Sequence, residues 1–229
     1  MNRSSRRSFL ASASALAGVS LLPNIVEAAQ APQGGWDLSF VDKLNGKHKQ
    51  VFDVMDTSVG LVVVKNWYEA WQAVYGLKNP DVNAIVAIAG KGFPINVSDA
   101  LYEKFKIGEL WQVNDATGKP ALKNPWIAGD RPGPQAGAGV LPLQARGAVF
   151  WMCNFALNNA AGRIATAIQR PQPEVYQELR AGLNPGVIVV PAHTMMVGVV
   201  QEKGFTYEVV RGDRRQEAGG SRQEAGGRE

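Results

Sequence analysis

Two apolar stretches decide the fold: GAVFWMCN at residues 147–154 and GVIVVPAHT at residues 186–194. A continuous apolar run of this length that follows a glycine is typical of a strand buried on both faces of a sheet. In the segment that follows each stretch, apolar residues recur at helical spacing. The sequence therefore predicts two strand–helix units, with Cys153 and His193 each just beyond the end of a strand.

Three more strands are expected near residues 48–55, 83–89 and 205–210, on either side of these two units. Asn66 followed three residues later by Glu predicts the start of a helix that Gly76 ends. Strands alternating with helical crossovers favour a mostly parallel sheet covered on both faces. We therefore predict an α/β, flavodoxin-like three-layer sandwich with a five-stranded sheet in the order 2-1-3-4-5.

In that strand order the third and fourth strands are neighbours, so Cys153 and His193 should emerge at the same edge. A helix beginning at Asn154 would direct free amides and its positive end at the sulfur, which favours the thiolate. Asn154 or Thr194 could orient either group. We take Cys153, His193 and Asn154 as candidate catalytic residues. The alternative is a buried, inert cysteine and a histidine that caps or packs a helix.

Metal and cofactor chemistry has little support in the sequence. One cysteine and two histidines cannot build an all-Cys/His zinc site of four ligands within one chain. Asp53 and Asp56 could bind a cation, but such residues are usually solvated at a turn. Cys153, His193 and a methionine such as Met152, Met195 or Met196 would suit copper, although Met195 and Met196 are better explained as core. We expect neither a metal nor a cofactor.

Several other function classes are disfavoured by composition and motifs. The chain has 229 residues, 45% of them hydrophobic, and a formal net charge of +4, part of which belongs to the first residues. This indicates one globular domain and no polybasic nucleic-acid surface. The glycine-rich motifs of nucleotide-binding loops and the Gly-x-Ser-x-Gly of α/β-hydrolases are absent from the sequence.

The first residues have the pattern of an export signal. Paired arginines in SRRSFL at residues 5–10 precede a short stretch rich in alanine and serine. This is similar to a twin-arginine (Tat) signal peptide, predicted to cover residues 1–28 with cleavage near Ala28. The apolar stretch is too short for a confident span, so we expect no stable membrane insertion after cleavage. The expected location is the periplasm.

The remaining domain boundaries follow from composition. We expect an N-terminal extension at 29–46, a domain at 47–211 and a disordered low-complexity tail at 212–229. Within the domain, residues 106–146 form a long insertion rich in glycine and proline. Its residues Trp111 and Trp126 could form a lid or an oligomer contact, or fasten the insertion to its own domain.

Three features occur in order in the second half of the chain: an apolar strand ending in cysteine at 146–154, a strand ending in Val-Pro-Ala at 186–192, and QEKGFTY at 201–207. These features give a resemblance to DsrE-like proteins of the sulfur-relay superfamily. It covers residues 146–210 well and 48–105 loosely. It implies a doubly wound α/β fold, homo- or hetero-oligomers, and a single cysteine that carries sulfane sulfur as a persulfide.

Of these family features, only the persulfide cysteine is carried over to a residue here, at Cys153. The first functional hypothesis is an exported sulfur-handling protein, a sulfurtransferase or sulfur carrier with a donor or acceptor protein as partner. The export signal, the 106–146 insertion and Ala192-His193 depart from the family pattern. The second hypothesis is a non-catalytic oligomeric binding module of the cell envelope, in which the insertion is a contact surface.

Overall fold

A computed structural model describes residues 35–57 and 61–210 of the chain. The predicted signal peptide at 1–28 and the predicted tail at 212–229 lie outside the described residues. The end of the N-terminal extension forms α1 (Phe40–Lys43), whose Val41 is buried. None of the helices in the described ranges is long and apolar enough to cross a membrane.

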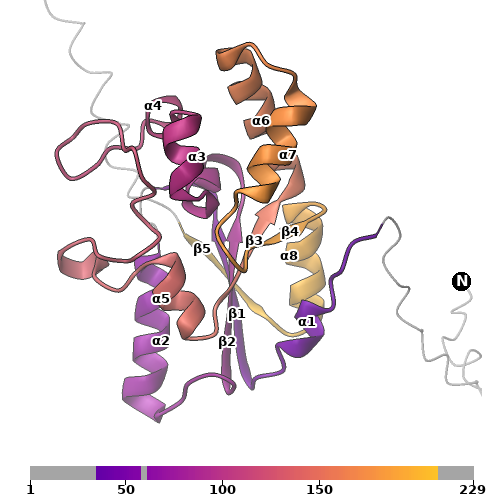
Figure 1. The fold of residues 1–229 in the computed structure, drawn as a ribbon. Helices are drawn as coiled ribbons and strands as arrows, with labels where there is room; N and C mark the ends of the chain where they lie inside the picture. Colours follow the sequence, from indigo (N-terminus) through magenta and orange to yellow (C-terminus); the bar gives the residue numbers. More distant parts are fainter. Residues whose placement is uncertain (1–34, 58–60, 211–229) are drawn as a thin grey trace, which may run out of the picture. The chain divides into compact units, whose positions relative to one another are not determined.

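The centre of the domain is a five-stranded sheet in which every neighbouring pair is parallel (Figure 1). The predicted α/β fold with a parallel sheet is confirmed. Its strands are β1 (His48–Val54), β2 (Val82–Ile88), β3 (Val149–Cys153), β4 (Ile188–Val190) and β5 (Thr206–Val210).

The predicted strand order is wrong. The observed order is β4-β3-β2-β1-β5, so β3 lies beside β2 and not beside β1. Both orders use right-handed crossovers between buried parallel strands, so the alternation of strands and helices does not choose between them. The third and fourth strands are neighbours in both orders, as Cys153↔Val190 pairing shows.

Two helical layers cover the sheet, and each has its own apolar core. One layer, which we call the front layer, contains α2 (Val62–Tyr75), α6 (Asn154–Ile168) and α7 (Gln172–Ala181). The rear layer contains α1 and α8 (His193–Glu202). Figure 1 shows α1 and α8 on one side of the sheet and α2 and α5 on the other.

The side chains of the strands alternate between these two cores, as the period of two requires. In β1, Phe52 belongs to the front core and Val51 to the rear core. In β3, Met152 faces the front and Trp151 the rear. Asp53 therefore points to the same rear face as Val51.

The first long helix begins earlier than its capping pattern predicted. α2 begins at Val62 and not at Asn66, and it ends at Gly76, whose φ of 68° is left-handed. Leu61 and Val64 are fully buried in the front core, so tertiary packing extends the helix toward its N-terminus.

The segment between β2 and β3 completes the front layer. It forms η1 (Gly90–Asn96), α3 (Asp99–Lys104), α4 (Ile107–Trp111), η2 (Gly133–Gln135) and α5 (Val140–Ala145). Its Trp126 is buried, and Trp111 packs on Phe93 with 4.9 Å between the ring centroids. Both tryptophans thus fasten the insertion to its own domain.

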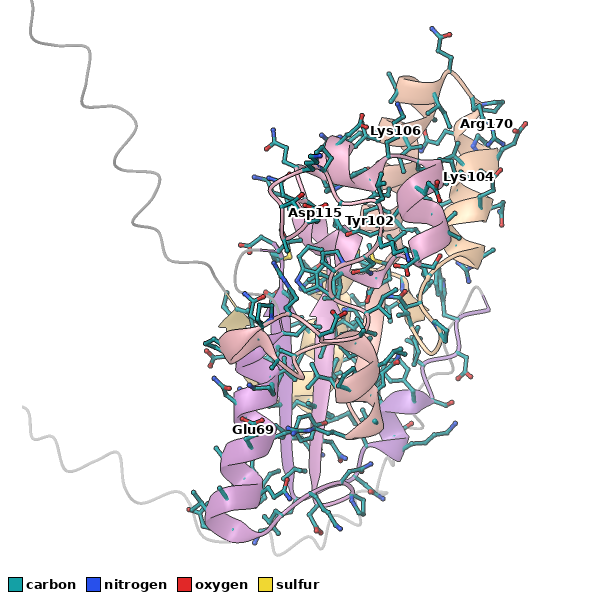
Figure 2. All side chains as sticks on the ribbon, turned by 60° about the vertical axis from the view of Figure 1, so that its left-hand side comes forward. Glu69, Tyr102, Lys104, Lys106, Asp115 and Arg170 are labelled. Atoms are coloured by element: carbon teal, nitrogen blue, oxygen red, sulfur yellow. The ribbon has the colours of Figure 1, made fainter. Side chains whose placement is uncertain are left out.

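Charged residues join two helices of the front layer near the end of the molecule where Lys104 and Arg170 are labelled in Figure 2. Glu178 on α7 lies 2.7 Å from Lys104 and 2.8 Å from Arg170, measured between side-chain nitrogen and oxygen. These hydrogen bonds hold the pKa of Glu178 below its ordinary value, with the Arg170 bond as the largest cause.

Candidate functional site

The observed strand order places a topological switch point between β3 and β4. The helix that follows β3 is α6 in the front layer, whereas the helix that follows β4 is α8 in the rear layer. Chains that leave neighbouring parallel strands on opposite faces open a crevice at the carboxyl edge of the sheet, where α/β proteins bind ligands. Cys153 and His193 lie at this crevice.

Cys153 lies between the N-termini of two helices. It is the N-cap residue of α6, with extended backbone angles of −65° and 124°. Its Sγ also accepts a hydrogen bond of 3.4 Å from the backbone N–H of His193, the first residue of α8. The positive ends of both helix dipoles thus lie beside this sulfur, and the amide that reaches it belongs to α8, since no N–H of the first turn of α6 caps the Cys153 side chain.

A cavity of about 540 Å³ opens beside the sulfur. Its lining comes from the carboxyl ends of β1 to β4 and from the helices that follow them. The lining residues are Met55, Ala89, Gly90, Lys91, Trp111, Cys153, Phe155, Ala156, Asn159, Ala160, Arg163, Ala192, His193 and Thr194. We call this cavity the cleft.

One wall of the cleft is a stripe of α6. Phe155, Asn159 and Arg163 are spaced by four residues, which places them on one face of a helix. The insertion supplies the facing residue Trp111, and the Arg163 guanidinium lies 4.8 Å from its ring centroid. Arg163 also donates a hydrogen bond to the carbonyl of Leu110. The insertion therefore contributes to the cleft as well as to the core.

The His193 imidazole is engaged away from the sulfur. Its Nε2 lies 3.0 Å from Asp53 Oδ1, and Trp151 Nε1 donates to its Nδ1 at 3.4 Å. Tyr207 donates its hydroxyl proton to the other Asp53 oxygen. We call Asp53, Trp151, His193 and Tyr207 the rear network.

The contacts of the rear network define the tautomer of His193. An indole N–H only donates, so Nδ1 of the neutral ring is the acceptor and Nε2 carries the proton; Nε2 lies 3.0 Å from Asp53 Oδ1 without forming a hydrogen bond of good geometry. Both ring nitrogens thus contact rear-network partners. Among the described contacts, the one that joins His193 to the Cys153 sulfur comes from the backbone amide.

Asn154, the third candidate residue, has a different position. Its Oδ1 accepts a hydrogen bond of 2.6 Å from the hydroxyl of Tyr176 on α7, and Arg180 donates to that hydroxyl at 3.1 Å. Asn154 does not line the cleft. Its contacts join α7 to the first turn of α6, directly beside Cys153.

The described ranges bear on the metal alternatives through the grouping and the burial of their residues. No group of three or more His, Cys, Asp or Glu residues there could hold a metal ion. Met195 is 44% exposed, so its interpretation as core is wrong, whereas Met152 and Met196 are fully buried. Asp53 is only 9% exposed, which rules out a solvated turn residue at that position.

Sequence reasoning missed most of the polar residues around the thiol. Asp53 lies among the apolar residues of β1, and a carboxylate in such a place indicates that it has a buried polar partner. Lys91 carried no comparable signal, because its position near Cys153 depends on the strand order. Arg163 did carry one, because it lies on the helix that begins directly after Cys153, on the same face as Phe155 and Asn159. The apolar run predicted Trp151 as a core residue of its strand. Its indole N–H finds a partner in His193 because α8, which begins at His193, lies in the rear layer.

Comparison of the chain with protein-family models, with curated proteins and with solved structures finds no match in any of the three.

Proposed function

We propose that this is an exported sulfur-handling protein in which Cys153 accepts and carries sulfane sulfur as a persulfide. The observation that carries the proposal is the position of its sulfur, at the wall of the cleft and at the N-termini of α6 and α8. A thiolate is the nucleophile in sulfur transfer, and helix N-termini stabilise a thiolate.

The chemistry needs one thiol. The Cys153 thiolate attacks the outer sulfur of a donor persulfide, R–S–SH, and forms a new S–S bond. The S–S bond of the donor breaks, and its electron pair leaves with the thiolate R–S⁻. Cys153 becomes Cys–S–SH, with no net oxidation or reduction. A thiolate acceptor that attacks the outer sulfur of Cys153 reverses the step and releases the product.

The burial of the cysteine suits a carrier. Cys153 is 6% exposed, and it contacts the cleft, so a transferred sulfur atom has room beside it. The same burial disfavours disulfide formation with another protein, because a large partner cannot bring its own sulfur to the Cys153 sulfur. A small donor reaches the thiol more easily than a folded domain does.

Export and self-association belong to the same proposal. The paired Arg6 and Arg7 before an apolar stretch support export by the Tat route to the periplasm. The resemblance to DsrE-like proteins supports a homo-oligomer, whereas the burial of Cys153 favours a small molecule over a partner protein as the source of sulfur.

Intact-mass measurement tests the proposal. Purified wild-type protein incubated with a small organic persulfide should gain the mass of one sulfur atom, and a reducing agent should remove it. Cys153→Ser should gain nothing, and circular dichroism would check that this variant is folded. An unchanged wild-type mass, or the same gain in Cys153→Ser, would contradict sulfur carriage and favour a binding module.

A further inference from the structure

The charge of the cleft is one-sided. Two lining residues, Lys91 and Arg163, are cations, and none of the described residues that line the cleft is acidic. A cleft lined by charges of one sign concentrates ligands of the opposite sign and speeds their arrival. The cleft therefore favours anions at the mouth of the Cys153 site.

The two cations differ in how they are held. The Arg163 guanidinium packs on Trp111 and donates to the Leu110 carbonyl, so its position is defined before a ligand arrives. Lys91 follows Gly90 directly after β2 and is exposed. Within the described ranges it forms no ion pair, which leaves its ammonium available to a ligand.

The rest of the lining is mainly apolar. Met55, Trp111 and Phe155 contribute large apolar side chains, and Phe155 is 67% exposed. A volume of about 540 Å³ falls in the range of sites for organic molecules and far exceeds a small inorganic oxyanion. An inorganic ion such as thiosulfate would leave these apolar walls without a partner.

From these observations we infer that the sulfur donor is a small organic persulfide with an acidic group, which Lys91 and Arg163 recognise while its carbon skeleton contacts the apolar walls. The inference rests on the proposed function, because it names the substrate class of the same site. It makes Lys91 and Arg163 specificity-determining residues, separate from the sulfur chemistry at Cys153.

Methanethiosulfonate reagents of different charge test the inference without requiring sulfur carriage. The Cys153 thiolate attacks the sulfenyl sulfur of CH₃SO₂–S–R, forms Cys–S–S–R and releases methanesulfinate, so only the charge of R changes between reagents. The sulfonatoethyl reagent is an anion and the trimethylammonioethyl reagent is a cation. The quantity measured is the ratio of their rates on the folded protein, divided by the ratio on the urea-unfolded chain.

We expect a normalised ratio of about 10 or more in favour of the anion at low salt, falling as salt is added. Lys91→Gln should lower the ratio about threefold, with a similar decrease for Arg163→Gln. Lys78→Gln is the matched control, because Lys78 precedes β2 and thus lies at the opposite edge of the sheet. It should leave the ratio unchanged.

A second measurement separates organic from inorganic anions. Phenylbutyrate should protect Cys153 from the neutral methyl methanethiosulfonate at a lower concentration than sulfate does. Equal protection by sulfate would overturn the organic class of the donor. A normalised ratio near one, or equal effects of Lys91→Gln and Lys78→Gln, would overturn recognition by the cations while sulfur carriage still stands. Failure of every reagent to label the folded protein would overturn both proposals.

Discussion

The cleft and the rear network meet at His193, and they differ in whether their charged side chains contact another polar side chain. In the cleft, Lys91 and Arg163 are exposed cations without an acidic partner in the lining. In the rear network, Asp53 and His193 are each at most 9% exposed and lie in contact. Unpaired charges can bind a ligand, whereas a buried pair fixes a structure.

His193 connects the two regions. Its imidazole contacts Asp53 and Trp151, while its backbone N–H donates to the Cys153 sulfur. The rear network therefore holds the first turn of α8 in the position from which its amide reaches the thiol. This makes Asp53 and Trp151 positioning residues and not catalytic ones.

The largest effect on stability is expected where the buried pair is broken. Asp53→Ala leaves the buried Nε2 of His193 and the hydroxyl of Tyr207 without their carboxylate partner and should lower the free energy of unfolding by about 2 kcal/mol. Asp42→Ala breaks the exposed pair between Asp42 on α1 and Lys203 at the end of α8. This change should lower the free energy of unfolding by less than about 1 kcal/mol. Urea denaturation measures both values. Equal losses would show that the rear network is not a buried structural pair.

A smaller effect, on rate, should separate the amide of His193 from its imidazole. His193→Ala and His193→Pro both remove the imidazole, but only His193→Pro also removes the backbone N–H that donates to Cys153. Proline fits the first position of a helix, and Ala192 before it already has the extended angles of −148° and 134° that proline requires.

Labelling of the two His193 variants by neutral methyl methanethiosulfonate near pH 7 measures this difference. We expect His193→Pro to react about fivefold more slowly than His193→Ala, since the lost hydrogen bond stabilises the thiolate and part of the loss is offset by nucleophilicity. Equal rates would show that the hydrogen bond from the backbone amide does not affect the reactivity of the Cys153 thiol.

The smallest effect is expected at the partly exposed charges that join α3 and α7. Glu178→Gln should lower the Tm slightly at pH 7, because the pKa of Glu178 is held below its ordinary value of 4.5 by Arg170 and Lys104. A depressed carboxyl pKa contributes stability above the unfolded pKa and loses it as pH falls through the folded pKa. The difference in Tm should therefore vanish in acid. A difference that grows in acid would contradict this assignment.

The sequence predicted β2, β3 and β4 well because each is a distinct apolar run between turns, and β1 because its apolar and polar residues alternate. It did not determine their order, since either winding direction satisfies right-handed crossovers. One signal was available: residues 84–89 are an unbroken apolar run, which fits a central strand, whereas the predicted order put that strand at an edge. In the structure β2 is central and residues 82–88 are all buried. The exposed Thr206, Tyr207 and Glu208 likewise fit β5 at an edge.

The candidate site was predicted in part for the same reason. Cys153 and His193 could be brought together because their strands are neighbours in both orders. The rear network could not be predicted, because Asp53 reaches His193 only when α8 crosses the rear of β1, β2 and β3 on its way to β5. Contacts between residues 140 positions apart depend on winding direction, which no local pattern records.

Whether Cys153 is a reactive thiol at the wall of the cleft is tested by its labelling rate in the folded protein, compared with its rate in the urea-unfolded chain. The reagent is neutral methyl methanethiosulfonate near pH 7, so the cations of the cleft do not bias the result. A thiolate stabilised by two helix N-termini at the wall of a cavity should react at least as fast in the folded protein as in the unfolded chain. A thiol that resists the reagent until the protein unfolds would contradict the account and make Cys153 a packing residue.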